Sequence, residues 1–332
     1  MSAPFREAIF RQPENLRAAA QAFREAIDGV DVTSLCHGTL VLSGIGASAS
    51  ALIPAMVALR AAGRRAFAVS AQELREGSAR LGDAFVLVSQ SGASAETVDA
   101  LRYIQDAPVV AISAKGDSPL AKAADVWLPL GPLPDTPVAT LSYTATLQAL
   151  GMLCDTLLRT ADDATVWDRL PDLATEVLEH ADDAVGPLAE RFAEVHALDA
   201  VGGGPAQASA AETALLAREG LRLAATGMET RAYLHGPMEA VAPGFGAVVF
   251  GREREHALAD ELASFGATVA LLSDTAAPAP DGVSKIELPR VPWLAAPVLQ
   301  ILPVQLLVEH AARHRGIAIG ELRRQQRDTK VT

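Results

Sequence analysis

The sequence is short of cysteine, of basic residues and of long uninterrupted apolar runs, and each shortage excludes a class of protein. Its 332 residues include two cysteines, Cys36 and Cys154, with no C-x-x-C pair and no histidine cluster. This excludes a disulfide-built scaffold and gives no zinc signature, so both are expected as small buried apolar residues. Lysine and arginine total 28 against 40 aspartates and glutamates, a net charge of −12. We therefore expect no nucleic-acid partner, because binding phosphates along a nucleic acid needs a basic face.

The apolar stretches also argue against a membrane protein. The longest one, 293–308, is interrupted by Pro297 and Pro303 and carries two glutamines, which favours a buried helix over a membrane span. The first sixteen residues contain charges and a proline where a secretory signal needs an apolar core. The prediction is a cytoplasmic protein.

The sequence contains an internal repeat, in which both halves have the same order of strands, turns and helices. Each half begins with an apolar strand, a glycine turn and a helix, continues with two further apolar strands, and closes with a long apolar helix. The matching segments are 40–63 with 197–217, 85–89 with 247–251, 109–113 with 269–273, and 138–157 with 294–312. Apolar strands that alternate with helices indicate a parallel sheet covered on both faces. The predicted fold class is α/β, with two related doubly wound parallel-sheet domains in tandem.

The domain boundaries follow from this repeat. Residues 1–30 are predicted to form a helical leader, and 31–160 the first domain. Residues 161–192, rich in Asp, Glu and Leu, are predicted to form connecting helices, and 193–332 the second domain with a C-terminal tail.

A polar segment, SQSGASAET, follows the apolar run 84–88 of the first half. It lies at the carboxyl end of a predicted parallel strand, where open α/β sheets bind ligands. A phosphate ester is well held by backbone N–H groups, short hydroxyls and a glycine that permits close approach. The segment supplies Ser89, Gln90, Ser91, Gly92 and Ser94. A serine-rich turn with ordinary helix capping is the alternative, and the matching strand of the second half is followed by GREREHALAD, with no serine cluster.

The first glycine turn, GIGAS, places Ser48 at the same sheet edge, where it could close the pocket. Gly44-x-Gly46-x-x-Ala49 also fits a relaxed dinucleotide fingerprint. That motif needs an acid at the end of the next strand, but this strand ends in Ser70 and Glu73 comes late. We therefore do not expect a nicotinamide site.

Taken together, GIGAS, SQSGASAET and the later ETALLAREG and YLHGP resemble the sugar isomerase (SIS) domain family. The chain is most similar to tandem members of that family, such as the isomerase half of glucosamine-6-phosphate synthase, over nearly its whole length. The resemblance implies two flavodoxin-like SIS domains, a homodimer with shared active sites, a sugar-phosphate ligand, and no metal or organic cofactor.

The resemblance also implies roles for particular residues. The phosphate end of the sugar would be held by Ser48, Ser89, Gln90, Ser91 and Ser94. Val138 and Ala139 would line the sugar site.

Three further residues would be catalytic. Glu219 would move a proton between C1 and C2, and His235 would assist ring opening, often from the neighbouring subunit. Lys330 is the nearest candidate for a lysine that forms an imine with the keto sugar.

The residues themselves support part of this assignment. Aldose–ketose interconversion needs one base that shuttles a proton between adjacent carbons, and a partly buried carboxylate suits that task. Glu212, Leu216 and Glu219 share one stripe of a predicted helix. The alternatives are a solvated pair of Glu219 with Arg218, and a surface role for His235 in its Gly-Pro turn.

The sequence also departs from the family pattern. Ser2 stands where the synthase has its cysteine nucleophile, so we expect no glutamine amidotransferase domain. No lysine follows the Val138-Ala139 stretch. The tail around Lys330 reads LRRQQRDTK, and Arg327 could occupy the same space, which puts imine chemistry in doubt.

The predicted function is that of a phosphosugar enzyme, an aldose–ketose isomerase or an amino-sugar-phosphate deaminase or deglycase. The alternative is a sugar-phosphate sensor that binds without turnover.

Overall fold

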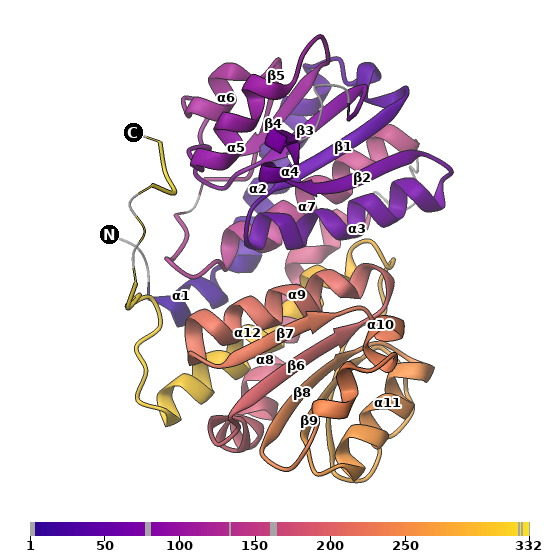
Figure 1. Cartoon of the computed structure of the whole chain (residues 1–332), viewed down its shortest axis with the longest axis vertical. Helices are drawn as coiled ribbons and strands as arrows, with labels where there is room; N and C mark the ends of the chain where they lie inside the picture. The colour runs from indigo at the N-terminus through magenta and orange to yellow at the C-terminus, as the bar shows by residue number, and fades with distance from the viewer. Residues whose placement is uncertain are drawn as a thin grey trace. The chain divides into compact units, whose positions relative to one another are not determined.

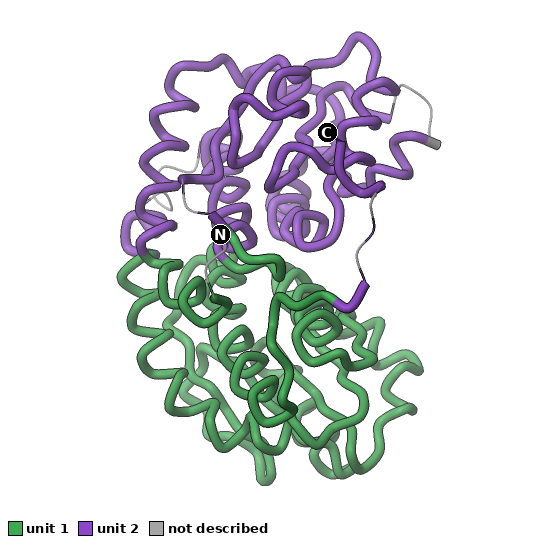
Figure 2. The backbone as a smooth tube through the Cα atoms, turned by 90° about the vertical axis from the view of Figure 1, so that its left-hand side faces the viewer, with its two compact units in different colours: residues 1–13, 135–140, 171–322 green, residues 14–134, 141–170, 323–332 purple. Residues whose placement is uncertain are grey.

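The computed structural model describes residues 4–76, 81–132, 134–159, 165–324, 326 and 328–331. It divides into two compact units, each assembled from separate stretches of the chain (Figure 2). Unit 1 contains residues 1–13, 135–140 and 171–322, and unit 2 contains residues 14–134, 141–170 and 323–332. Each unit holds one of the two predicted repeats, although the structural units are not the linear segments that the sequence suggested.

Unit 2 is built on a five-stranded parallel sheet with strand order β2-β1-β3-β4-β5. The strands are β1 (Thr39–Gly44), β2 (Arg65–Ser70), β3 (Ala84–Val88), β4 (Val109–Ser113) and β5 (Val126–Pro129). The helices are α3 (Ala47–Ala61), α4 (Ala71–Glu76), α5 (Ala95–Ala100), α6 (Pro119–Ala123) and α7 (Leu141–Leu158), with most of α2 (Gln12–Asp28) and the short turns η1 (Thr33–Cys36) and η2 (Leu101–Tyr103). This strand order is the flavodoxin-like one.

Unit 1 repeats the same topology. Its sheet has the order β10-β9-β8-β6-β7, which is the first order read from the other edge. The strands are β6 (Ala197–Gly202), β7 (Ala224–Met228), β8 (Phe245–Phe250), β9 (Thr268–Ser273) and β10 (Val283–Glu287). The helices are α1 (Phe5–Phe10), α9 (Gln207–Leu216), α10 (Thr230–Leu234), α11 (Glu253–Ser264) and α12 (Ala296–His314), with η3 (Gly204–Ala206), η4 (Ala217–Leu221) and η5 (Pro237–Ala240). The predicted α/β class and its doubling are confirmed.

Both faces of each sheet are buried, as near-continuous apolar strands require. In β8, Ala247 and Val249 pack with Leu258 and Leu262 of α11, while the alternate residues Val248 and Phe250 point the other way and are also fully buried. Figure 1 shows helices on either side of each sheet. The carboxyl edges of the sheets are therefore left as the places where loops can form sites.

One long helix stands where connecting helices were predicted over 161–192. α8 runs without a break over Val166–Ala193, although it contains Pro171 and Pro187. A proline removes one backbone donor and usually bends or ends a helix. Here a stripe that includes Leu170, Ala174 and Leu178 is almost fully buried, and this packing outweighs the local cost of the prolines.

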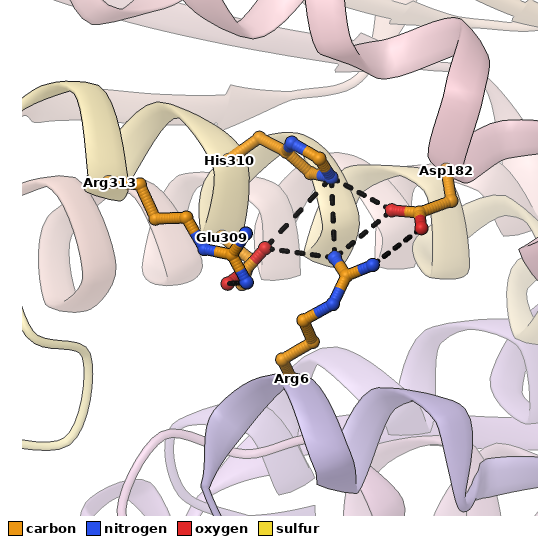
Figure 3. A network of polar contacts seen from close by, with 5 residues as sticks. All are labelled: Arg6, Asp182, Glu309, His310 and Arg313. Carbon is orange, nitrogen blue, oxygen red and sulfur yellow. Dashed lines mark hydrogen bonds and ion pairs between the residues drawn. The ribbon is translucent and has the colours of Figure 1, made fainter.

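A charged network holds the first helix within unit 1 (Figure 3). The guanidinium of Arg6 donates to both oxygens of Asp182, at 3.0 and 2.5 Å, and to Glu309 at 3.2 Å. His310 Nε2 lies 2.8 Å from Asp182, and Arg313 pairs with Glu309 at 2.6 Å. The side chain of Glu309 is only 9% exposed, so its negative charge depends on these partners.

The two cysteines are both free, but only one is buried as expected. Cys154 is fully buried, which raises the pKa of its thiol, whereas Cys36, which ends η1, is half-buried. Among the described helices we find none with the length and hydrophobicity that crossing a bilayer requires.

Candidate active site

The predicted phosphate loop begins where β3 ends. All five residues of β3 are buried, and Ser89, next in the chain, is 1% exposed. The Ser89 N–H donates to the carbonyl of Ile112, which continues the sheet for one more residue. The chain then turns, with the Gly92 N–H donating to the Ser89 carbonyl at 2.9 Å. The loop thus starts from a rigid strand end.

Gly92 is required at the centre of this turn. Its φ is +63°, in the left-handed region, and an added Cβ would lie 2.0 Å from Ser118 Oγ and 2.4 Å from Ser118 Cβ. Ser118 is itself fixed, because its hydroxyl caps α6 by accepting from the Ala121 N–H. The backbone therefore approaches the start of α6 more closely than any side chain would permit.

The loop hydroxyls form one connected group. Ser89 Oγ donates to Ser94 Oγ at 3.1 Å and accepts from the Ser94 N–H at 3.4 Å. Ser91 Oγ accepts from the Ala93 N–H at 3.3 Å. Ser94 is the N-cap residue of α5, but its side chain makes no capping hydrogen bond. Ordinary capping therefore does not account for the serines.

Lys330 lies at these hydroxyls. Its ammonium donates to Ser91 Oγ at 3.0 Å and to Ser94 Oγ at 3.2 Å. The tail is held there by its backbone: Ser94 and Lys330 form an antiparallel bridge, the Ala95 N–H donates to the Thr329 carbonyl, and the Val331 N–H to the Ala93 carbonyl. An exposed cation beside two half-buried hydroxyls is suited to an anionic ligand. Arg327, the other residue considered for this position, lies outside the described residues.

Ser48 comes from the neighbouring strand. β1 pairs directly with β3, and the turn after β1 leads through Gly46 into α3, where Ser48 is half-buried in the first turn. The helices that follow β1 and β3 begin at the same edge of the sheet, at the point where the strand order reverses. The hydroxyls of Ser48 and of the 89–94 loop, with half-buried Gln90, are thus at one edge of unit 2.

The acid that a dinucleotide site would need has another partner. Glu73 accepts from the Ser70 N–H at 2.6 Å, and its own N–H donates to Ser70 Oγ at 3.1 Å. This is a reciprocal cap at the start of α4. These hydrogen bonds lower the pKa of Glu73, and they disfavour a ribose-binding role for it.

The predicted catalytic carboxylate belongs to unit 1. Glu219 lies in η4, a π-helical turn that extends α9, and such turns are frequent at functional sites. It is half-buried, and burial raises the pKa of its carboxyl group. Its neighbour Arg218 donates instead to the Ala225 carbonyl at 2.8 Å, which argues against a solvated Glu219–Arg218 pair.

Glu212, two turns earlier in α9, is fully buried. Among the described residues, neither of its carboxylate oxygens has a hydrogen-bond partner. Desolvation, and then the charges of Glu219 and Asp135, raise the pKa of Glu212 well above its usual value. Burial raises the pKa of both neighbouring carboxyls, that of Glu212 more strongly, and such a difference in environment can divide proton-holding and proton-accepting roles between two acids.

Asp135 fixes the stretch that contains Val138 and Ala139. Its carboxylate accepts from the Thr140 hydroxyl at 2.6 Å and from the N–H groups of Thr140 and Thr136. Val138 is fully buried and Ala139 half-buried. Since the charge of Asp135 acts on Glu212, this turn and the two glutamates are neighbours in unit 1. Asp135 was not among the predicted site residues, although an aspartate that opens a turn is a recognisable signal.

His235, the predicted ring-opening residue, is exposed. It is the residue that ends α10, immediately before Gly236, whose φ is +130°. Among the described residues, its imidazole makes no hydrogen bond. A histidine held this openly is available to a ligand or a second chain, and its role stays a prediction.

Comparisons with known proteins agree with this arrangement. Residues 35–158 match the family described as SIS domain. The glutamine–fructose-6-phosphate aminotransferase (isomerizing) of Pyrobaculum aerophilum is 28% identical over 326 residues, which is 93% of this chain and 54% of that protein. The chain therefore spans about half the length of this curated relative.

Solved structures share the whole fold. The C-terminal domain of the glucosamine-fructose-6-phosphate aminotransferase of Francisella tularensis matches with a TM-score of 0.86 and 20% identity, covering 96% of this chain and 98% of that one. The glucosamine-6-phosphate deaminase of Thermotoga maritima matches with a TM-score of 0.82 and 21% identity, covering 99% and 100%. Residues 35–158 thus match the SIS domain family, and the solved structures show that the chain shares their fold over nearly its whole length.

Proposed function

We propose that this protein is an enzyme of phosphosugars, acting as an aldose–ketose isomerase or as a deaminase or deglycase of amino-sugar phosphates. The observation that carries the proposal is the 89–94 loop, where the ammonium of Lys330 and the hydroxyls of Ser91 and Ser94 meet around a glycine turn. Hydroxyls and one cation favour a phosphate ester over a neutral ligand. The names of the relatives above point to the same class of substrate.

In this proposal Glu219 is the base. It takes the proton from C2 of the open-chain aldose and returns it to C1 while the O2 hydroxyl proton passes to O1, so that the carbonyl moves from C1 to C2. The partial burial that raises the pKa of Glu219 brings it closer to the working pH of a general base. In deamination the same transfer gives a C2 imine, and water then releases ammonia and leaves the keto sugar.

Lys330 has a different role here from the one that the family resemblance implied. Its ammonium is engaged by two serine hydroxyls, so we assign it to the charge of the phosphate group rather than to an imine. Val138 and Ala139 are proposed to line the sugar site, and His235 to assist ring opening. The homodimer and the cytoplasmic location remain predictions.

The test is product identification with a panel of hexose and hexosamine 6-phosphates. Glucosamine 6-phosphate should yield ammonia and fructose 6-phosphate if the protein is a deaminase. Glucose 6-phosphate in D₂O should gain deuterium at C2 if it is an isomerase. Glu219→Gln should abolish turnover and leave sugar-phosphate affinity largely unchanged, whereas Glu176→Gln, at an exposed position of α8, should change neither.

Binding is tested separately from turnover. Ser91→Ala should weaken binding of the phosphorylated sugar roughly ten- to 150-fold, because it removes a hydrogen bond to a charged group. Ser34→Ala, an exposed serine of η1, is the matched control. Equal affinity for phosphorylated and free sugar at this loop would refute the phosphate assignment. Tight binding with no product from any sugar of the panel would instead identify a sensor.

A further inference from the structure

Unit 1 contains a cavity of about 240 Å³ at the carboxyl edge of its own sheet. We call it the Trp293 cavity. Its walls come from the loops that follow β6, β8, β9 and β10 and from the start of α12. It is the counterpart of the phosphate-loop edge in unit 2, because the strand order of unit 1 reverses at the same place, between β6 and β8. The proposed function uses no residue of this cavity.

At this sheet edge, a carboxylate of the protein itself occupies the position that corresponds to the phosphate loop of unit 2. Gly251 occupies the place in the repeat that Ser89 has in the first half, and the carboxylate of Glu255 lies over it. Glu255 accepts from the Thr230 hydroxyl at 2.8 Å and from the Arg252 N–H at 3.2 Å. A phosphate would meet a negative charge here instead of the hydroxyls of the first half. The cavity is therefore unsuited to a phosphorylated ligand.

A second charged pair lies beside it. The guanidinium of Arg252 donates to both oxygens of Asp274, at 2.8 and 2.6 Å. The three charged residues that line the cavity, Arg252, Glu255 and Asp274, have a net charge of −1. The paired geometry fixes a planar array of donors and acceptors, and half of the Arg252 side chain remains open to solvent.

The rest of the wall is mostly apolar and includes two aromatic residues, Phe250 and Trp293, with Ser273 and Gln300 as its uncharged polar residues. Trp293 is 45% exposed, unusual for so large a ring. Gln300 is anchored at one end, where its Oε1 accepts from Ser209 Oγ at 2.7 Å. The other end of the amide, Nε2, has no partner among the described residues. An apolar wall with a few fixed polar groups is the usual composition of a small-molecule site.

We propose that the Trp293 cavity binds an unphosphorylated monosaccharide. A sugar ring presents C–H groups on its faces, which suit the indole of Trp293. Its hydroxyls both donate and accept, so they match the Gln300 amide and the Arg252–Asp274 pair. The volume lies just below the usual range of roughly 300–1,000 Å³, which fits one ring and no larger ligand. This site goes beyond the proposed function and rests on other residues.

Tryptophan fluorescence tests the proposal on the intact protein. The probes are glucose, galactose, mannose, N-acetylglucosamine and glucosamine, with glucose 6-phosphate and uridine as comparisons. At least one free sugar should cause a saturable change in emission that disappears in Trp293→Phe. By calorimetry, Trp293→Ala should weaken that sugar at least about fivefold through loss of the stacking surface. Ser91→Ala, in the other unit, should leave its affinity unchanged.

Several results would overturn it. The first is the absence of a saturable response to any free sugar at about 20 mM, a concentration well above the millimolar Kd of a weak site. The second is a Trp293-dependent response to glucose 6-phosphate that is as strong as the response to glucose. The third is a response to uridine alone. If Trp293→Ala loses its fold by circular dichroism, Gln300→Leu replaces it, with an expected loss of several-fold. Unchanged affinity in Gln300→Leu would then count against the site.

Discussion

Replacing Gly92 by alanine should both destabilise the protein and damage the phosphate loop. The substitution has two separable costs. A left-handed φ costs a non-glycine residue about 1–2 kcal/mol. The new methyl group would also lie 2.4 Å from Ser118 Cβ. Rotation of the Ser118 side chain can move its Oγ but not its Cβ, so the backbone must shift, which costs about a further 1–3 kcal/mol.

Gly63→Ala is the matched control, because it carries only the first cost. Gly63 follows the end of α3 with a φ of +77°, and an added Cβ there meets nothing within 4 Å. Its N–H donates to the Arg60 carbonyl and the Arg64 N–H to the Leu59 carbonyl, the usual pattern of a left-handed residue that ends a helix. The difference between the two variants isolates the close approach. At about 2–4 °C per kcal/mol for a unit of this size, Gly92→Ala should unfold roughly 2–12 °C below Gly63→Ala by scanning calorimetry.

Ligand binding gives the second readout. A backbone shift at Gly92 moves the neighbouring hydroxyls, so Gly92→Ala should also lose affinity for glucose 6-phosphate in a calorimetric titration. Adding Ser118→Ala should not restore it, because the Cβ remains. A Gly92→Ala protein that is as stable as Gly63→Ala and binds the phosphate ester like the unmodified protein would refute the close approach as the cause.

Three further predictions concern charged groups. Glu212→Gln should flatten the pH dependence of the free energy of unfolding. Because the pKa of Glu212 is raised in the folded state, the native protein loses stability as the pH rises from about 4.3 towards that pKa. In urea unfolding, this loss should be absent from Glu212→Gln and present in Glu176→Gln. Arg6→Met should cost about 1–3 kcal/mol at pH 7. Because Arg6 lowers the pKa of Asp182, the difference from the unmodified protein should shrink in urea unfolding as pH falls from about 3.9 through that lowered value, and a constant difference would contradict the pairing. Lys330→Gln should weaken phosphate-ester binding in a calorimetric titration, and more at low salt than at high salt, because salt screens an exposed charge. A loss of affinity that does not depend on salt would contradict the role of the Lys330 charge.

Much of the fold could be predicted because both halves repeat one apolar pattern. The runs at 85–89 and 109–113 are buried strands because few polar residues interrupt them, and their ends place Ser89 at a sheet edge. The same logic placed the second set of strands. The pattern of apolar residues therefore predicted the strands and helices that pack in the core, because side-chain type decides structure there.

Three features were outside the reach of such patterns. The tail around Lys330 pairs through its backbone N–H and carbonyl groups, which any residue possesses, so its charged sequence carries no strand signal. α8 continues through two prolines because tertiary packing overrides local propensity. The Trp293 cavity draws its walls from several loops, and only the folded chain brings Asp274 and Gln300 together.

The interleaved make-up of the two units has a practical consequence for anyone who wishes to study them one at a time. Since each unit takes residues from before and after the other, a gene cut at any single point encodes at least one product that lacks part of its own structure. Isolating either unit would require joining its separate stretches to one another with added linkers. Dissection by simple truncation should yield insoluble or protease-sensitive fragments.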